Sequence, residues 1–98
     1  MLFQVSYRPK ANATEAQDKR IMQVFSKWKP PAGMEIKAHY ARPDGGGFVI
    51  AEANAVAPLI EVIAVYATWF DYEVTPIVDI SEAVPAIERA FAWRDTVR

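Results

Sequence analysis

The chain has 98 residues, of which 52% are hydrophobic, with a formal net charge of −1, no cysteine and a single histidine. This length predicts a single domain over residues 1–98, and the near-zero charge gives no reason to expect a nucleic-acid partner. The absence of cysteine excludes disulfides and zinc–thiolate sites, and one histidine excludes a multi-histidine metal site within one chain. We therefore expect no metal and no cofactor.

The start of the chain, MLFQVSYRPK, lacks the charged segment and long apolar run of a signal peptide. The most apolar stretch, AVAPLIEVIAVYATWF, contains Glu61 and is shorter than the roughly 20 residues that a membrane-spanning helix needs. We therefore expect a cytoplasmic protein without a membrane partner.

The first two predicted elements are a strand and a helix. Apolar and polar residues alternate over residues 3–7, which is typical of a half-buried strand, and Pro9 ends it. Thr14 and Gln17 have the spacing of a capping box, so a helix begins there and ends before the prolines at 30 and 31. Its apolar face consists of Ile21, Val24, Phe25 and Trp28.

Two further strands follow, over residues 34–41 and 47–53. The glycines at 45–47 between them raise the question of a phosphate-binding loop. Such a loop needs Gly-Lys-Ser/Thr opening a helix, whereas here a strand continues. Pro43, Asp44 and the glycines instead supply the residues that a tight turn requires, so we predict a hairpin.

The second half of the chain predicts a helix, a strand and a last helix. Asn54 and Ser81 are each followed four residues later by proline, which we interpret as two helix starts. The second helix then runs from about residue 54 to residue 69, and a fourth strand covers residues 71–79. The apolar side of the last helix carries Val84, Ile87, Ala90 and Phe91, with Arg94 at its end.

This order, β-α-β-β-α-β with an extra C-terminal helix, predicts an α+β ferredoxin-like fold with an antiparallel sheet. Two helices would cover one face of the sheet. Alternation assigns to that covered face Phe3, Val5, Tyr7, Ile36, Ala38, Tyr40, Val49, Ala51, Tyr72 and Val74. It assigns to the other, open face Gln4, Ser6, Lys37, His39, Phe48, Ile50, Glu52, Glu73 and Thr75.

The open face is apolar in its middle strand and polar around it, as in many ligand pockets. The simplest hairpin register sets Lys37 opposite Glu52 and His39 opposite Ile50. Histidine exchanges protons readily near neutral pH, so His39 is the candidate acid/base group or anion-binding group. The alternative is a histidine buried in a dimer interface.

Four other polar residues are candidate ligand contacts: Gln4, Lys37, Glu52 and Glu73. Two carboxylates held apart in a partly dry pocket can divide the roles of acid and base, so Glu52 and Glu73 could act as such a pair. In the alternative interpretation, Glu52 forms an ion pair with Lys37, and Glu73 is solvated at an edge strand.

The whole chain resembles the dimeric α/β-barrel superfamily of ferredoxin-like proteins, in which two sheets pack face to face. Within it, the segments KPPAGMEIKAHY, GGGFVIAEA and FDYEVTPIVDISEAVPAI resemble a family of short bacterial proteins described only as a domain of unknown function. The superfamily includes cofactor-independent monooxygenases, muconolactone isomerases, haem-degrading enzymes and ligand-sensing modules. It has no shared catalytic motif that matches a position here.

The resemblance implies a homodimer that binds a small, partly apolar organic molecule between sheet and helices. Chemistry like that of a cofactor-independent monooxygenase or an isomerase would then involve His39. The alternative is a non-catalytic dimeric module whose interface is filled by side chains. The hydrophobic excess for so small a domain favours a partner surface under both hypotheses.

Overall fold

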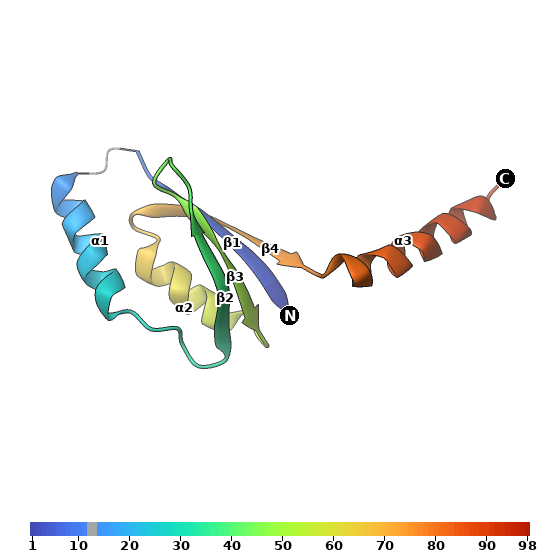
Figure 1. Ribbon diagram of the computed structural model, residues 1–98, viewed down its shortest axis with the longest axis horizontal. Helices are drawn as coiled ribbons and strands as arrows, with labels where there is room; N and C mark the ends of the chain where they lie inside the picture. Colours follow the sequence, from blue (N-terminus) through green and yellow to red (C-terminus); the bar gives the residue numbers. More distant parts are fainter. Residues whose placement is uncertain (12–13) are drawn as a thin grey trace.

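The computed structural model describes residues 1–11 and 14–98 and contains four strands and three helices. In chain order these are β1 Leu2–Pro9, α1 Glu15–Lys27, β2 Met34–Ala41, β3 Gly47–Ala53, α2 Ala57–Tyr66, β4 Phe70–Ile77 and α3 Ile80–Asp95. The strands form one antiparallel sheet in the order β2-β3-β1-β4. The predicted α+β ferredoxin-like arrangement with an extra C-terminal helix is therefore confirmed (Figure 1).

The hairpin between β2 and β3 is a tight turn, as the sequence predicts. Gly45 has a φ of 86°, a left-handed conformation that glycine adopts without strain. Its N–H donates to the carbonyl oxygen of Arg42 at 3.2 Å, which closes the turn. Asp44 Oδ1 accepts from the Gly46 N–H at 2.8 Å, and this bond, together with the Arg42 guanidinium, holds the pKa of Asp44 below its usual range.

The capping box of α1 is also confirmed. Thr14 Oγ1 accepts from the Gln17 N–H at 3.2 Å, and Gln17 Oε1 accepts from the Thr14 N–H at 3.1 Å. The two side chains thus satisfy two of the backbone groups that a helix start leaves without partners. The helix ends at Lys27, just before Trp28 and the two prolines.

The starts predicted for the other two helices are wrong. Residue Val56, not Asn54, precedes the first turn of α2, and no side chain caps it. At α3, Asp79 is the cap: its Oδ1 accepts from the Ser81 N–H at 2.8 Å. Because Asp79 caps α3, it does not end the strand, and β4 ends at Ile77 rather than at residue 79.

The structure corrects the face assigned to His39. The register of β2 against β3 shifts between Ile36 and Ala38, so that His39 lies opposite Val49 rather than opposite Ile50. A bulge of this kind inserts one extra residue into a strand and turns every later side chain to the other face. His39 therefore lies on the face covered by helices, and Ala38 and Tyr40 lie on the open face.

Helices α1 and α2 lie on the same side of the sheet (Figure 1). The buried core between them and the sheet is small and consists of Phe3, Val5, Ala51, Ala53 and Leu59. Every side chain of α1 is at least partly exposed. This helix is thus held against the sheet by less apolar contact than α2, and space remains beneath it.

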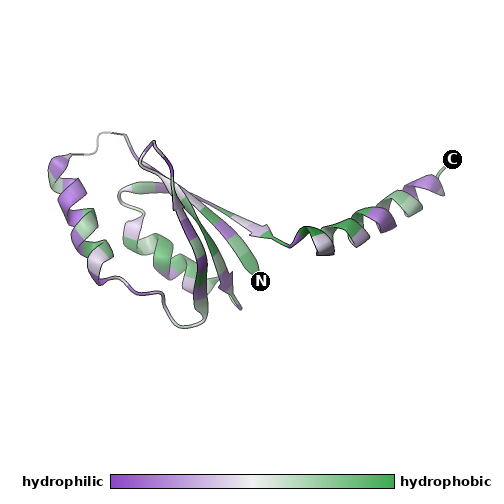
Figure 2. Ribbon diagram, in the orientation of Figure 1, coloured by the Kyte–Doolittle hydropathy of each residue, from purple (hydrophilic) through white to green (hydrophobic). Residues whose placement is uncertain are grey.

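Helix α3 leaves the body of the molecule beyond the end of β4 and projects away from the sheet (Figure 1). The molecule measures 62 × 30 × 19 Å and has a radius of gyration of 17.8 Å. A compact domain of this length has a radius of gyration of about 13 Å. Apolar and polar segments alternate along α3 (Figure 2), and Ile87 and Phe91 on its apolar side are 45% and 50% exposed.

Among the described residues, none of the helices has the length and apolar character needed to cross a membrane.

Candidate functional site

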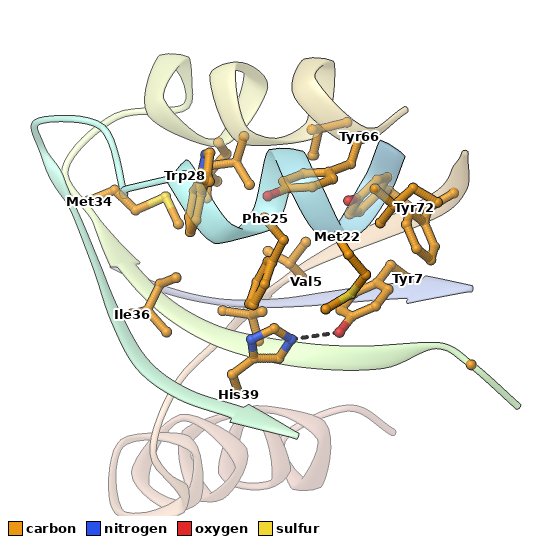
Figure 3. Close-up of a pocket in the computed structure, with 17 residues that line it drawn as sticks. Val5, Tyr7, Met22, Phe25, Trp28, Met34, Ile36, His39, Tyr66 and Tyr72 are labelled. Carbon is orange, nitrogen blue, oxygen red and sulfur yellow. Dashed lines mark hydrogen bonds between the residues drawn. The ribbon is translucent and has the colours of Figure 1, made fainter. Parts of the chain in front are cut away.

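A pocket of about 260 Å³ lies between the covered face of the sheet and helices α1 and α2. Its floor comes from β1, β2, β3 and β4, and its walls come from the two helices (Figure 3). An apolar cavity of ~150 Å³ can hold benzene, so this space is large enough for a larger organic molecule. It is the natural candidate site, and it lies on the face opposite to the one that the sequence pattern favours.

The pocket is lined mostly by aromatic and aliphatic side chains. Its aromatic residues are Tyr7, Phe25, Trp28, Tyr66, Phe70 and Tyr72. Several of these rings meet edge to face: Tyr7 and Phe70 have centroids 5.4 Å apart at 85°, and Trp28 and Tyr66 lie 6.2 Å apart at 68°. Lysine, arginine, aspartate and glutamate do not contribute to the lining among the described residues.

A hydrogen-bonded pair, Tyr7 and His39, lies in the pocket. The Tyr7 oxygen and His39 Nε2 are 2.6 Å apart (Figure 3). Tyr7 comes from β1 and His39 from β2, two strands that β3 separates in the sheet. The bulge before Ala38 makes this pairing possible because it turns His39 toward the helices. The pair combines a phenol and an imidazole, which can donate or accept a proton at this position.

Gly47 gives Tyr7 the space to reach His39. A Cβ atom at Gly47 would lie 2.7 Å from the Tyr7 hydroxyl oxygen and would also collide with the carbonyl oxygen of Tyr40. The Tyr7 ring therefore crosses the backbone of β3 where that strand has no side chain. The third glycine of the turn thus contributes to the site, although it binds no phosphate.

Tyr66 contributes a buried hydroxyl group without a hydrogen-bond partner among the described residues. Its side chain comes from the last turn of α2, and the residue is only 7% exposed. Figure 3 shows its hydroxyl end pointing into the pocket, on the side where Phe25 and Trp28 lie. An unsatisfied buried hydroxyl costs about 1–3 kcal/mol and therefore needs an explanation.

Burial raises the pKa values of three tyrosines around the pocket, Tyr7, Tyr66 and Tyr72, above the usual range. For Tyr7, the nearby Arg42 guanidinium partly opposes this effect. The three phenols are therefore protonated near neutral pH, and the pocket presents neutral hydroxyl groups that can donate hydrogen bonds.

The other predicted site residues lie outside this pocket, on the open face. Lys37 Nζ is 3.4 Å from Glu52 Oε2, which confirms the predicted ion pair, and 3.2 Å from Glu35 Oε2. These two glutamates, not Lys37 and Glu52, lie directly opposite each other. The two carboxylates raise the pKa of Lys37, Glu35 most strongly.

Gln4 and Glu73 also lie on the open face but apart from this ion-pair cluster. Gln4 is opposite Ile50 and Thr75 in the middle of the sheet. Glu73 lies opposite Ser6 on β1, whereas Glu52 lies opposite Leu2. Four residues along the strand and two strand spacings separate these carboxylates by roughly 16 Å. They therefore cannot act together on one small molecule as an acid/base pair.

Sequence reasoning did not identify Tyr7, Tyr66 and Tyr72 as site residues. Alternation correctly assigns Tyr7 and Tyr72 to the covered face, but it does not indicate that they line a pocket. The available signal was chemical: a tyrosine under a helix layer needs a partner for its hydroxyl group. An apolar core does not need polar side-chain groups, so three such tyrosines and a histidine beneath one helix layer indicate a site.

The fold and this pocket define the class: a small α+β protein of ferredoxin-like topology with an aromatic pocket under its helix layer. A family model described as "Domain of unknown function (DUF3303)" matches residues 1–91, and the chain belongs to this family. Comparison with curated proteins yields no match, and neither does comparison with solved structures.

Proposed function

We propose that the chain binds a small, partly apolar organic molecule in the pocket beneath α1 and α2. The observation that carries this proposal is the pocket itself: about 260 Å³ of space with an aromatic lining and a few inward polar groups. Ligand sites commonly have this composition. A ligand there would also complete the packing of α1, whose side chains all remain partly exposed.

The Tyr7–His39 pair is the group through which chemistry on such a ligand would proceed. In an isomerase-like reaction, His39 would remove a proton from one position of the ligand and return it to another. Cofactor-independent monooxygenase-like chemistry would begin with the same proton removal. The His39→Ala variant should then lose turnover while ligand binding is weakened only slightly. Retained turnover in this variant would contradict the role of His39.

Native mass spectrometry of protein purified gently from its producing cells tests the binding proposal. We expect a mass increment above the chain mass of 11.0 kDa, or above its multiple. The Ile36→Trp variant, which fills the pocket from β2, should lose the increment. The matched Ile60→Trp variant, at a 60% exposed position of α2, should keep it. An increment that persists equally in both variants would place the ligand elsewhere.

We propose separately that the chain forms a homodimer through the open sheet face and α3. Helix α3 projects away from the sheet (Figure 1), and its apolar side is exposed, with Ile80 70% exposed. The open face presents Tyr40 and Phe48, whose rings lie 5.3 Å apart, and separately the carboxylates Glu52 and Glu73. A 16-residue helix is about 24 Å long, close to the length of these strands.

A second copy of the chain is the partner that supplies both surfaces at once. In a two-fold arrangement, each α3 would lie on the other copy and each open face would be covered. Arg94, at the end of the apolar side of α3, has the charge that complements the carboxylates of the open face. An isolated helix of this length is marginal in water, so α3 gains stability from such a contact.

Light scattering coupled to size-exclusion chromatography tests the homodimer. The chain should elute at twice its mass of 11.0 kDa, and Ile87→Glu on the apolar side of α3 should give a monomer. Ala92→Glu, on the opposite side of the same helix, is the matched control and should remain dimeric. A monomeric native chain would contradict the dimer. If the dimer forms while the pocket carries no ligand, a non-catalytic assembly module becomes the favoured function.

A further inference from the structure

The lining of the pocket restricts which class of molecule the pocket can hold. The lining residues include no lysine, arginine, aspartate or glutamate among those described. His39 is the lining residue that can carry a charge near neutral pH, and its Nε2 is already bonded to Tyr7. A charged ligand would therefore lose its hydration without gaining a free ion-pair partner, which is strongly unfavourable. The chemistry of the walls therefore selects an uncharged molecule.

The walls also favour a flat, aromatic molecule. Rings from both helices and from two strands surround the space, and pairs of them meet at steep angles of 68° and 85°. Aromatic rings prefer offset-stacked or edge-to-face neighbours, so an aromatic ligand finds favourable partners on several sides. A cavity of about 260 Å³ has room for about two fused rings, since ~150 Å³ holds benzene.

Among the described residues, one fully buried polar side-chain group in the pocket lacks a hydrogen-bond partner. The Tyr66 hydroxyl is buried, points into the pocket and is without a hydrogen-bond partner among the described residues. Tyr7, by contrast, already bonds to His39. A phenol hydroxyl is a donor, and its strongest neutral complement is a carbonyl-type oxygen. A ligand with such an oxygen would satisfy the group that the protein alone leaves unsatisfied.

We propose that the ligand is an uncharged aromatic molecule of about two rings, with a carbonyl-type oxygen that accepts a hydrogen bond from Tyr66. This inference rests on the proposed binding function, because it specifies the chemistry of the same pocket. It assigns Tyr66 as the residue that selects for the oxygen, in addition to Tyr7 and His39. The discriminating feature is the oxygen, so the test compares molecules that differ in that atom.

Titration with three defined probes, followed by NMR of the backbone amides, tests the proposal. The probes are 1-tetralone, tetralin, which has the same skeleton without the oxygen, and tetralin-1-carboxylate, which is charged. We expect 1-tetralone to bind about tenfold more tightly than tetralin, which is the effect of one net hydrogen bond. The carboxylate should bind more weakly than both.

The Tyr66→Phe variant tests the assigned residue. It should bind tetralin as the native chain does but lose the preference for 1-tetralone. Tyr40→Phe, an exposed tyrosine on the open face, is the matched control and should keep that preference. The probe comparison on the native chain remains decisive even if Tyr66→Phe fails to fold.

The two proposals fail in different ways. If none of the three probes binds in the pocket, the binding function is contradicted together with the ligand class. If 1-tetralone and tetralin bind equally, or if the carboxylate binds most tightly, the pocket binds ligands but the proposed class is wrong. An equal preference for 1-tetralone in Tyr66→Phe and in the native chain would overturn the role of Tyr66.

Discussion

At the scale of single residues, Gly47 connects the hairpin to the candidate site. The turn needs a left-handed residue at Gly45, but Gly47 serves a different purpose, which is to leave space for the ring of Tyr7. The same three-glycine run thus fixes the turn at one end and the Tyr7–His39 pair at the other. A substitution at Gly47 should therefore affect the site as well as the stability.

We expect Gly47→Ala to displace Tyr7 and to break its hydrogen bond to His39, because the added Cβ atom would lie 2.7 Å from the hydroxyl oxygen. The free energy of unfolding should fall by about 1–3 kcal/mol, the usual cost of overpacking. Urea denaturation measures this loss, and NMR of the His39 ring nitrogens reports the hydrogen bond. The His39 signals should resemble those of Tyr7→Phe, and signals equal to those of the native chain would contradict the prediction.

At Tyr66 we expect stability and ligand binding to oppose each other. Removing its unsatisfied hydroxyl group in Tyr66→Phe should raise the free energy of unfolding of the ligand-free chain by about 1 kcal/mol at neutral pH. The same variant should lose the preference for an oxygen-bearing ligand. Chemical denaturation without ligand measures the first effect, and a destabilised variant would show that the hydroxyl is satisfied in solution.

The raised pKa of Tyr66 also predicts how stability changes at alkaline pH. Burial raises the pKa of the folded state above that of the unfolded chain, which releases its tyrosine protons first as the pH rises. The stabilisation that this pKa difference gives the folded state is therefore fully present below about pH 10, and it is lost as the pH rises above that value. Unfolding free energies between pH 8 and pH 11 should fall less steeply in Tyr66→Phe than in the native chain. Equal slopes would contradict the prediction.

At the scale of elements, α1 is the wall of the pocket with no buried side chain. Its side chains are all partly exposed, so its local hydrogen bonds matter more for its position than its apolar contacts do. The capping box at Thr14 and Gln17 is the strongest of these local features. Loosening the start of α1 should therefore open the pocket while the sheet remains intact.

We expect Thr14→Ala to weaken α1 by about 1 kcal/mol, because it removes the cap. Hydrogen exchange should become faster in the first turns of α1 and remain unchanged in β1 and β3. Ser26→Ala is the control, since Ser26 Oγ donates to the Gln23 carbonyl oxygen in the last turn and caps nothing at the helix start. Equal acceleration in both variants would contradict a specific role for the cap.

At the scale of the whole molecule, the shape is set by α3. The radius of gyration of 17.8 Å exceeds the ~13 Å of a compact domain because this helix projects from the body. Only two residues, Val78 and Asp79, separate β4 from α3, and Asp79 is held by its bond to the Ser81 N–H. This short connection leaves α3 to project beyond the end of β4 (Figure 1).

Small-angle X-ray scattering on the Ile87→Glu variant tests this shape. If that variant is monomeric, as proposed above, its radius of gyration should be close to 18 Å, because α3 still projects. A value close to 13 Å would show that α3 folds back onto its own sheet once the partner is lost. Ala92→Glu, expected to be dimeric, gives the reference for the assembled protein.

The sequence by itself determined the features that depend on a few neighbouring residues. The order of the elements, the turn at Gly45 and the cap at Thr14 all follow from local periodicity and turn chemistry. The Lys37–Glu52 ion pair was also predictable, because it joins neighbouring strands of one hairpin. The starts of α2 and α3 were missed, because α2 begins after Val56 without a side-chain cap and Asp79 rather than Ser81 caps α3.

Only the tertiary structure decided where the candidate site lies. One extra residue in β2 turns His39 from the open face to the covered face, and strict alternation cannot foresee a bulge. The meeting of Tyr7 with His39 depends on strands that are not adjacent in the sheet, and the position of Tyr66 depends on how α2 packs above them. These distances are fixed by strand register and helix packing, which involve residues far apart in the chain, so local sequence patterns do not contain them.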